Sequence, residues 1–165
     1  MRVGIALGSN LGDRMENLRR ARRAILGLVG EKNLETSPVY ETEPVGCEPG
    51  ASKFLNTVLE IEYDGDPMEL LDHMIEIEES LGRKRDHVSS ISRKIDIDLL
   101  YADDLNVKNE RLQLPHPRMS WRRFVLQPLA DIRPDLILPG QTRPVRELLA
   151  QLKDSATVSR FAENW

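Results

Sequence analysis

Two carboxylates lie two residues apart in a short apolar segment, and their spacing suits them to hold a metal ion. Asp96 and Asp98 belong to the segment 95–101, which otherwise has the composition of a buried strand. Because side chains alternate across a strand, the two carboxylates leave the same face and lie close together. Two like charges on a half-buried face repel unless a cation lies between them, and Mg²⁺ prefers such oxygen ligands. The alternative for this motif alone is a strand edge whose charges oppose aggregation.

Cationic side chains directly precede the two carboxylates, although the chain as a whole is acidic. The formal net charge is -4, so the positive charge is confined to a site and does not cover the surface. Cations beside a dicarboxylate favour a bound polyphosphate. The cationic residues are Arg83, Lys84, Arg85, His87, Arg93 and Lys94.

Length and composition predict one globular domain over residues 1–165. A chain of 165 residues can bury a substantial core, and 40% hydrophobic with 30% charged residues is ordinary for such a domain. The single cysteine, Cys47, excludes an intrachain disulfide and is expected to be a bystander. Because no segment resembles a signal peptide, a cytoplasmic location is expected. Apolar runs are too short to cross a membrane, and the acidic balance argues against nucleic acid as a partner.

Hydrophobic periodicity predicts strand, helix, strand and strand in the first part of the chain. The segment 3–10 is expected to be a buried strand that runs into a Gly/Asn turn. Further strands are expected over 34–40 and 54–63, and a helix over about 13–30. Asp13 is the expected helix cap. The apolar stripe of this helix is Leu18, Ala21, Ile25 and Leu28. The irregular segment 41–53 is long for a turn, and loops of that length are commonly functional.

A second helix is predicted from Asp66, its N-cap, to Gly82. Its expected apolar stripe is Leu71, Met74, Ile75 and then Glu78, where the spacing calls for a hydrophobic residue. A carboxylate on a buried stripe needs a partner. The alternative is that the last turn projects beyond the core into water.

Proline on both sides fixes the backbone around His116. A histidine held in this way is either a packing residue in a rigid turn or a donor that contacts a ligand. Short helices are expected after it, up to Ala130 and over 145–152.

The order of elements predicts an α+β fold, a ferredoxin-like sandwich with a mostly antiparallel sheet and helices packed on its faces. A doubly wound nucleotide-binding fold would need a glycine-rich phosphate loop after the first strand. The segment 8–12 has neither the GxGxxG nor the GKS/T spacing, so that alternative is not supported.

Ordered motifs along the chain resemble one known family. They are Ala6-Leu7-Gly8-Ser9-Asn10-Leu11-Gly12, Tyr40-x-Thr42-x-Pro44, Phe54-Leu55-Asn56, Glu78, Gly82-Arg83-x-Arg85, Arg93-x-x-Asp96-Ile97-Asp98, Pro115-His116 and Arg122-x-Phe124-x-x-x-Pro128-Leu129. Together they resemble the 6-hydroxymethyl-7,8-dihydropterin pyrophosphokinases of folate biosynthesis, which move a pyrophosphoryl group from ATP to a pterin alcohol. So many motifs in order are far more specific than any one of them.

The resemblance implies roles for the charged residues. Asp96 and Asp98 would hold two Mg²⁺ ions that bridge the phosphates of ATP, the co-substrate. The implied catalytic residues are Arg83, Arg85, Arg93 and Arg122. The implied nucleotide-binding residues are Glu78, Arg111 and His116, together with Arg83, Arg85 and Arg93.

The resemblance also implies a site for the pterin. This flat ring would lie between Phe54 and Phe124, where stacking favours it, while Asn56 offers an amide donor and acceptor. The remaining implied pterin-binding residues are Thr42, Glu43 and Val45. For the two phenylalanines, the alternative is an ordinary core position. A monomer with ATP and the pterin as its only partners is expected.

The chain departs from the family pattern in two segments. The family usually has a Trp-Gly-Pro type segment before the key arginine, where this chain has Ser90-Ile91-Ser92. Glu43 stands where the family often has proline. Residues 83–92 are expected to form a lid that orders over the triphosphate.

Two other classes of protein remain as alternatives. A ferredoxin-like binding module could hold single-stranded RNA on its aromatic side chains and basic loop. A metal-dependent transferase could use the two aspartates on a sugar nucleotide. The net charge opposes the first, and the second gives the pterin-loop motifs no role.

Overall fold

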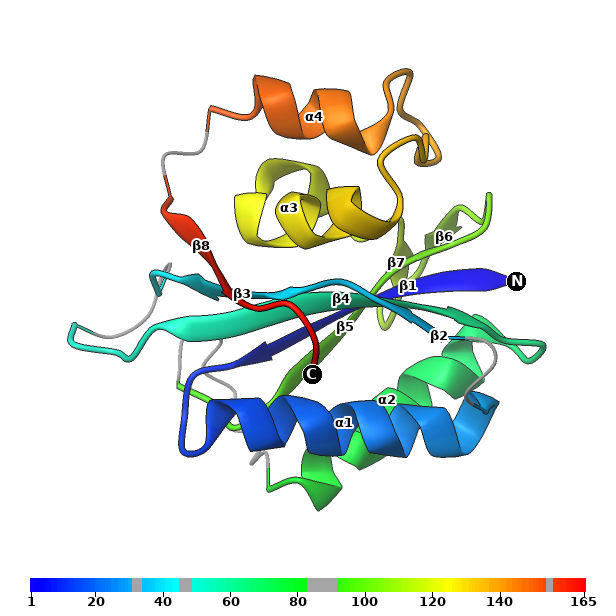
Figure 1. The fold of residues 1–165 in the computed structure, drawn as a ribbon. Helices are drawn as coiled ribbons and strands as arrows, with labels where there is room; N and C mark the ends of the chain where they lie inside the picture. The colour runs from blue at the N-terminus through cyan, green and yellow to red at the C-terminus, as the bar shows by residue number, and fades with distance from the viewer. Residues whose placement is uncertain (31–33, 45–48, 83–91, 154–155) are drawn as a thin grey trace.

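A six-stranded sheet runs through the middle of the molecule and carries helices on both faces (Figure 1). This computed structural model describes residues 1–30, 34–44, 49–82, 92–153 and 156–165. The strands of the sheet are β1 (Arg2–Ser9), β2 (Leu34–Thr36), β3 (Val39–Thr42), β4 (Phe54–Glu62), β5 (Asp96–Ala102) and β8 (Val158–Ala162). The helices are α1 (Arg14–Val29), α2 (Pro67–Ser80), α3 (Arg123–Ile132) and α4 (Val145–Gln151). A small hairpin of β6 (Val107–Lys108) and β7 (Gln113–Leu114) and a 3-10 turn, η2 (Met119–Trp121), complete the described elements.

The strand order confirms the predicted ferredoxin-like fold. The order is β5-β1-β4-β3-β8, with β2 also paired to β4, and each of these pairs is antiparallel. Between the two neighbouring strands β1 and β4, the chain passes through α1 and the short strands β2 and β3. Within the described residues, no helix has both the length and the apolar character needed to cross a bilayer.

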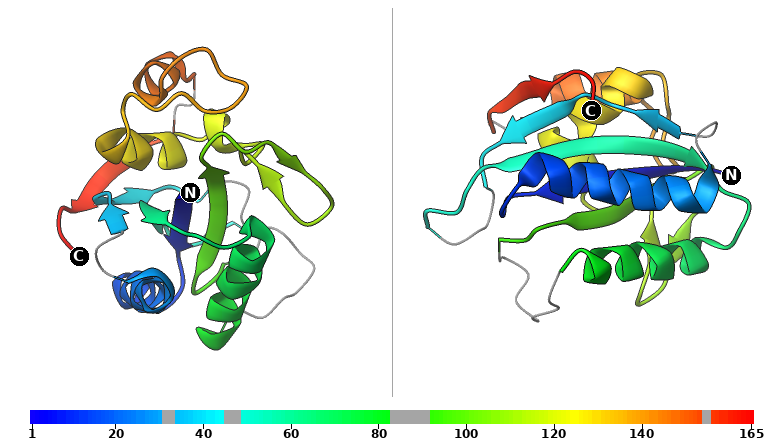
Figure 2. Two further views of the ribbon diagram at one scale, coloured as in Figure 1. Left: turned by 90° about the vertical axis from the view of Figure 1, so that its right-hand side faces the viewer. Right: turned by 60° about the horizontal axis from the view of Figure 1, so that its bottom comes forward.

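The two faces of the sheet support two separate cores. Alternate residues of β1, such as Ile5 and Leu7, pack against α1 and α2, which lie side by side on one face (Figure 2). On the other face, Val58 of β4 packs with Leu126 and Leu129 of α3, and α4 covers that helix. Because residues of β1 with even numbers face α3, the side chains of the candidate site lie on this second face.

The helix ends form as their sequences predict, but the buried stripes differ in part. Asp13 and Asp66 cap α1 and α2, since their carboxylates accept hydrogen bonds from backbone N–H groups of the first turn. The expectation that Leu28 is buried is wrong, because it lies in the last turn of α1 and is 41% exposed. In α2 the buried positions are Leu70, Met74, Ile77 and Glu78, so the inward face is rotated from the predicted one.

The predicted single strand over 34–40 is wrong, because the segment forms two strands, β2 and β3. Thr36 pairs with Leu59 and Tyr40 pairs with Asn56, so this side contains one extra residue, as in a β-bulge. The bulge includes Ser37, whose hydroxyl accepts a hydrogen bond from the Val58 amide at 3.0 Å. The hydroxyl thus accepts the hydrogen bond that a backbone carbonyl accepts in a regular ladder. The next residue, Pro38, has no N–H to donate to the ladder.

The C-terminal end of α3 is fixed to the sheet by two polar clusters. Arg133 lies 3.2 Å from the buried carboxylate of Glu60, which also accepts a hydrogen bond of 2.6 Å from the Tyr101 hydroxyl. Burial, followed by this hydrogen bond, raises the pKa of Tyr101, so the hydroxyl stays a donor. In the second cluster, Asp131 accepts a hydrogen bond of 2.5 Å from the Tyr40 hydroxyl. The first residues of α3 lie at the opposite end of the helix, at the candidate site.

Candidate active site

The candidate site lies where β1 ends and β5 begins, and a row of paired residues crosses the sheet there. Asp96 pairs with Gly8, Gly8 with Asn56, and Asn56 with Tyr40. Directly paired residues point to the same face of a sheet. Asp96 and Asn56 therefore flank Gly8 on the face that α3 covers.

Gly8 forms the floor between these two side chains. A Cβ atom at this position would lie 3.0 Å from Asn56 Oδ1, 3.8 Å from Phe54 Cδ1 and 3.9 Å from Asp96 Cβ. A larger residue would therefore push against Asn56. Sequence patterns place Gly8 only at the turn after the first strand and in a family motif. They do not indicate this role, which depends on the register of three strands.

Asp96 and Asp98 lie at the start of β5, half-buried and on the same face, as predicted. Arg93 is close, with Nη1 3.1 Å from Asp96 Oδ1. Within the described residues, no group of three or more His, Cys, Asp or Glu side chains could hold a metal ion. Two carboxylates without further protein ligands still fit Mg²⁺, which usually keeps waters and phosphate oxygens in its coordination shell.

Glu78 is a buried carboxylate that contacts the strand between the two aspartates. Its Oε1 accepts a hydrogen bond of 2.6 Å from the backbone amide of Ile97, and the residue is 5% exposed. Of the two interpretations of Glu78, the projection into water is therefore wrong. The carboxylate fixes the backbone from which Asp96 and Asp98 project.

Arg93 is anchored to the end of β1 through Asn10. The Arg93 amide donates to Asn10 Oδ1 at 2.8 Å, and the Asn10 amide donates to the Arg93 carbonyl at 3.2 Å. Asn10 Nδ2 also donates to Ser92 Oγ at 3.1 Å. The Nε atom of Arg93 is buried without a hydrogen-bond partner in the part of the chain that the structure describes. The Nε–H group is thus a donor beyond the ion pair with Asp96.

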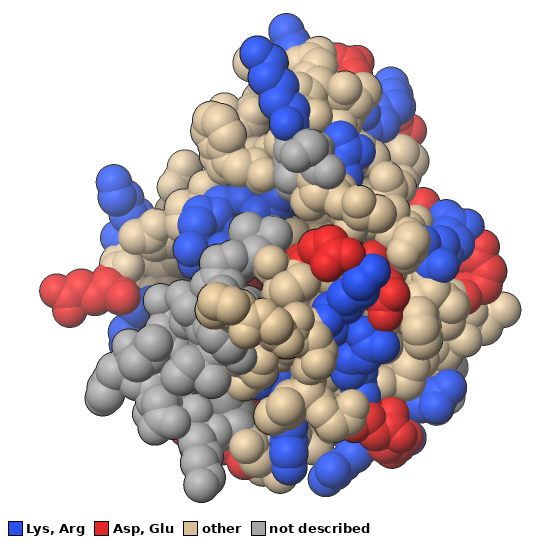
Figure 3. Space-filling model, turned by 90° about the vertical axis from the view of Figure 1, so that its left-hand side faces the viewer, with Lys and Arg blue, Asp and Glu red and all other residues tan. Residues whose placement is uncertain are grey.

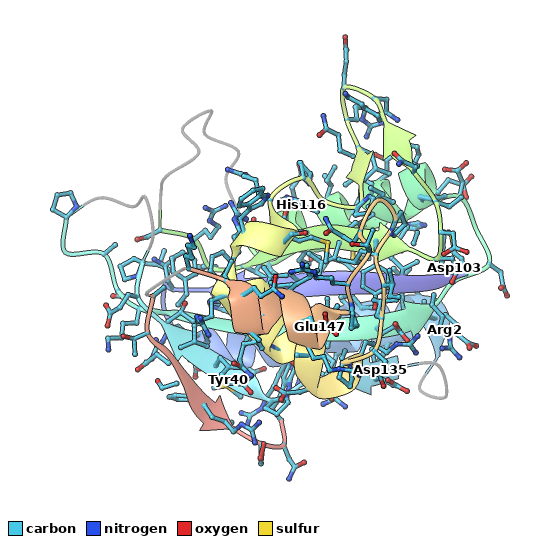
Figure 4. All side chains as sticks on the ribbon, turned by 90° about the horizontal axis from the view of Figure 1, so that it is seen from above. Arg2, Tyr40, Asp103, His116, Asp135 and Glu147 are labelled. Atoms are coloured by element: carbon cyan, nitrogen blue, oxygen red, sulfur yellow. The ribbon has the colours of Figure 1, made fainter. Side chains whose placement is uncertain are left out.

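His116 is held in the turn between β7 and η2 by its backbone and its ring. Its amide donates to the Leu100 carbonyl at 2.7 Å, and Nδ1 accepts from the Arg118 amide at 3.2 Å. Burial, then the charges of Arg122 and Arg118, lower the pKa of His116 to about 4. The ring is therefore neutral near pH 7, and the hydrogen bond to Nδ1 leaves the proton on Nε2. Seen from above, His116 lies on the β5 side of α3 and Tyr40 on the β3 side (Figure 4).

Arg122 and Phe124 lie at the start of α3, above the same face of the sheet. The guanidinium carbon of Arg122 is 5.3 Å from the centroid of the Phe124 ring, a cation–π distance. Burial and the charge of Arg118 lower the pKa of Arg122, whereas the carboxylates of Asp98 and Asp96 act in the opposite direction. Arg122 is thus close enough to both aspartates to share their electrostatic environment.

Asn56 is oriented by Thr42 on the neighbouring strand. Its Nδ2 donates to Thr42 Oγ1 at 2.7 Å, and both side chains are buried. Phe54 is the direct partner of Thr42 in the ladder between β3 and β4. The hydrogen bond to Thr42 leaves Oδ1 of Asn56 as the acceptor that faces Gly8.

The comparison with known proteins agrees with this geometry. The family described as 7,8-dihydro-6-hydroxymethylpterin-pyrophosphokinase (HPPK) matches residues 4–134, the segment that contains every element of the site. The chain belongs to this family. The family predicted from the sequence is thereby confirmed.

Curated HPPK relatives match most of the chain. The 2-amino-4-hydroxy-6-hydroxymethyldihydropteridine pyrophosphokinase of Bacillus subtilis is 44% identical over 128 residues, which are 78% of this chain and 75% of the relative. The protein of the same name from Methylorubrum extorquens is 40% identical over 154 residues, 93% of this chain and 95% of the relative.

A solved structure supports the fold. A crystal structure of Plasmodium falciparum HPPK-DHPS aligns with a TM-score of 0.71 at 16% identity and covers 91% of this chain. The chain spans 45% of the length of that protein. At this identity the likeness supports the HPPK fold alone.

Some predicted site residues are engaged elsewhere or lie outside the described residues. Arg111, after the hairpin strand β6, forms an ion pair with Asp72 of α2. Glu43 is exposed and lies 2.8 Å from Lys53 Nζ. Arg83, Arg85 and Val45, and most of the predicted lid over 83–92, lie outside the described residues. On the side of the molecule that Figure 3 shows, Lys and Arg side chains gather beside the grey, undescribed atoms.

Proposed function

We propose that the chain transfers the pyrophosphoryl group of ATP to the hydroxymethyl group of 6-hydroxymethyl-7,8-dihydropterin, a step of folate biosynthesis. AMP and the pterin diphosphate are the products. Family membership and the names of relatives with 37–44% identity support this activity. The observation that carries the proposal is the row of paired residues Asp96, Gly8 and Asn56. It places a carboxylate suited to bind a metal ion beside a buried side-chain amide suited to hydrogen-bond a pterin.

The pterin would bind over Gly8, with its ring between Phe54 and Phe124. A floor without a side chain lets a flat ring approach the backbone of β1. Asn56 is held by Thr42, so its amide is already oriented for an edge of the ring. A pre-oriented group loses less freedom on binding and contributes more to affinity. Glu43 and Val45 complete the proposed pterin-binding set.

The phosphates of ATP would bind to the cationic side of the site. Arg93 is paired with Asp96, Arg122 senses the charges of both aspartates from the start of α3, and neutral His116 offers its Nε2 proton. Such fixed donors stabilise charge that develops during phosphoryl transfer. Arg83 and Arg85 are proposed for the same role, and Glu78 and Arg111 for the nucleotide site.

Asp96 and Asp98 would hold Mg²⁺, and two ions are proposed. When bound, the metal would neutralise phosphate charge and orient the reacting groups. Glu78 would fix the direction of both carboxylates through the Ile97 amide. A hydrogen bond to the backbone between two ligands acts on both at once.

In the proposed reaction the pterin hydroxyl oxygen forms a bond to the β-phosphorus. The bond from that phosphorus to the oxygen that bridges the α- and β-phosphates breaks, AMP leaves with the electron pair, and the hydroxyl proton is released to water. The residues of this chain bind and align the two substrates and offset the charge on the oxygens. Phosphoryl transfer needs little more from a protein than positioning and charge stabilisation.

We further propose that one domain, residues 1–165, is a monomer in the cytoplasm, without nucleic acid partners. The N-terminal strand β1 lies in the centre of the sheet and the C-terminal strand β8 at its edge, so both ends of the chain take part in one fold. The single cysteine is consistent with a reducing compartment.

The test is AMP formation from ATP in the presence and absence of the hydroxymethyl pterin and of Mg²⁺. AMP should form only when all three are present. AMP formation without the pterin, or pterin-dependent formation of ADP in its place, would contradict the proposal.

A further inference from the structure

Two arginines border the η2 turn and lie close to each other. Arg118 precedes the turn and Arg122 follows it, and the Trp121 amide donates to the Arg118 carbonyl at 3.2 Å. Among the residues that the structure describes, neither arginine forms an ion pair with a carboxylate within 4.0 Å. Like charges four residues apart in a helical turn repel and destabilise it. Within the described residues, no ion pair to a carboxylate therefore offsets the repulsion between the two guanidinium groups.

The backbone of Arg118 is fixed to the candidate site. Its amide donates to Nδ1 of His116 at 3.2 Å, and the Met119 amide donates to the His116 carbonyl at 3.1 Å. Met119 is 1% exposed and anchors the turn in the core above the sheet. The Arg118 side chain, in contrast, is exposed. A rigid backbone with an exposed guanidinium suits a group that contacts a ligand from solution.

The charge of Arg118 acts on the site itself. Burial is the largest cause of the low pKa of His116, and the charges of Arg122 and Arg118 lower it further. The charge of Arg118 also lowers the pKa of Arg122. Arg93 is already paired with Asp96 at 3.1 Å. Among the described arginines of the site, Arg118 and Arg122, on either side of η2, are thus the two without an ion pair to a carboxylate within 4.0 Å.

We propose that Arg118 is a further nucleotide-binding residue, whose guanidinium contacts phosphate oxygens of ATP from the His116 side of the site. This rests on the proposed function. A bound polyphosphate would offset the repulsion between Arg118 and Arg122, and the planar guanidinium can form two parallel hydrogen bonds to it. The pterin carries no such charge, so Arg118 acts on the nucleotide alone.

The test compares Arg118→Gln with Arg20→Gln in steady-state assays of AMP formation. Arg20 is an exposed arginine of α1, on the opposite face of the sheet, and is a matched control. The loss of a charge-assisted contact should raise KM for ATP about tenfold in Arg118→Gln. KM for the pterin should stay within about twofold, and Arg20→Gln should match the wild type. Arg118→Lys, which keeps the charge but loses the fork, should fall between the two.

A binding measurement separates affinity from turnover. The dissociation constant of a non-hydrolysable ATP analogue, measured at several salt concentrations, should depend less steeply on salt in Arg118→Gln than in the wild type. Equal KM values for ATP and equal salt dependence in the two proteins would overturn the proposal for Arg118. If the wild type forms no AMP from ATP and the pterin, the proposed function itself fails, and the two failures are distinct.

Discussion

Substitution of Gly8 by alanine tests the floor of the proposed pterin site. The added Cβ would lie 3.0 Å from Asn56 Oδ1, where ordinary contacts begin at 3.4 Å. Asn56 must therefore move by a few tenths of an ångström. It cannot do so freely, because its Nδ2 is bound to Thr42 Oγ1 at 2.7 Å. The strain falls on a group that we propose reads the pterin.

The expected loss follows from this one displaced side chain. A hydrogen bond contributes about 0.5–1.5 kcal/mol net. If Gly8→Ala weakens the bond between Asn56 and the pterin, affinity should fall by about 1 kcal/mol, or about fivefold in Kd. The free energy of unfolding should change little, because alanine suits a strand interior better than glycine and this gain opposes the contact strain.

Isothermal titration calorimetry with the pterin, together with thermal unfolding, measures both quantities. Gly27→Ala is the matched control, since Gly27 lies in α1 and a Cβ there would have no neighbour within 4 Å. This control should be more stable by about 0.5–1 kcal/mol and should bind the pterin as the wild type does. Unchanged pterin affinity in Gly8→Ala, with a normal unfolding transition, would refute the assignment of Gly8 as the floor.

Three further predictions concern the metal, the ring and the histidine. Asp96→Asn or Asp98→Asn should leave the circular dichroism spectrum unchanged but lower kcat by several orders of magnitude with Mg²⁺, and wild-type turnover in either would exclude a metal role. Phe124→Ala should weaken pterin binding by about 1–3 kcal/mol and spare the ATP analogue, which calorimetry can check; equal losses for both ligands would point to a general disturbance of α3. Because the pKa of His116 is about 4 in the fold and about 6.5 for a histidine in the unfolded chain, the unfolded chain takes up the proton first as the pH falls. His116 should therefore have no effect on stability above about pH 6.5 and should destabilise the fold between about pH 6.5 and 4; an NMR titration of its ring with a midpoint near 6.5 would contradict this.

The sequence could predict the fold where local signals and tertiary packing agree. The caps at Asp13 and Asp66, the apolar run of β1 and the alternation in β4 predicted elements that the structure contains. It could not predict the bulge at Ser37, which exists because a hydroxyl substitutes for a carbonyl of the ladder. Strand β8 was also missed, because a short, half-exposed edge strand has little hydrophobic pattern.

For the candidate site, the spacing of Asp96 and Asp98 was sufficient to predict that both carboxylates share one face. The role of Gly8 was hidden, since it depends on which residues lie opposite in two neighbouring strands. The contact between Glu78 and the Ile97 amide was also hidden, because a backbone N–H leaves no trace in the sequence. Residues that act through a partner distant in the chain are thus the ones that a pattern of side-chain types cannot identify.

Helix α3 acts as a lever, because it is fixed to the sheet at one end and positions a site residue at the other. The pivot is the C-terminal end, where Arg133 pairs with Glu60 and Asp131 is hydrogen-bonded to Tyr40. Arg122 lies at the other end. Ten residues of α-helix are about 15 Å long, so a tilt of about 4° at the pivot would displace Arg122 by about 1 Å. Displacements of that size can cost about 100-fold in rate. A screen for altered turnover should therefore recover substitutions at the pivot as well as at the site, and loss of activity alone would not reveal at which end of the lever a residue lies.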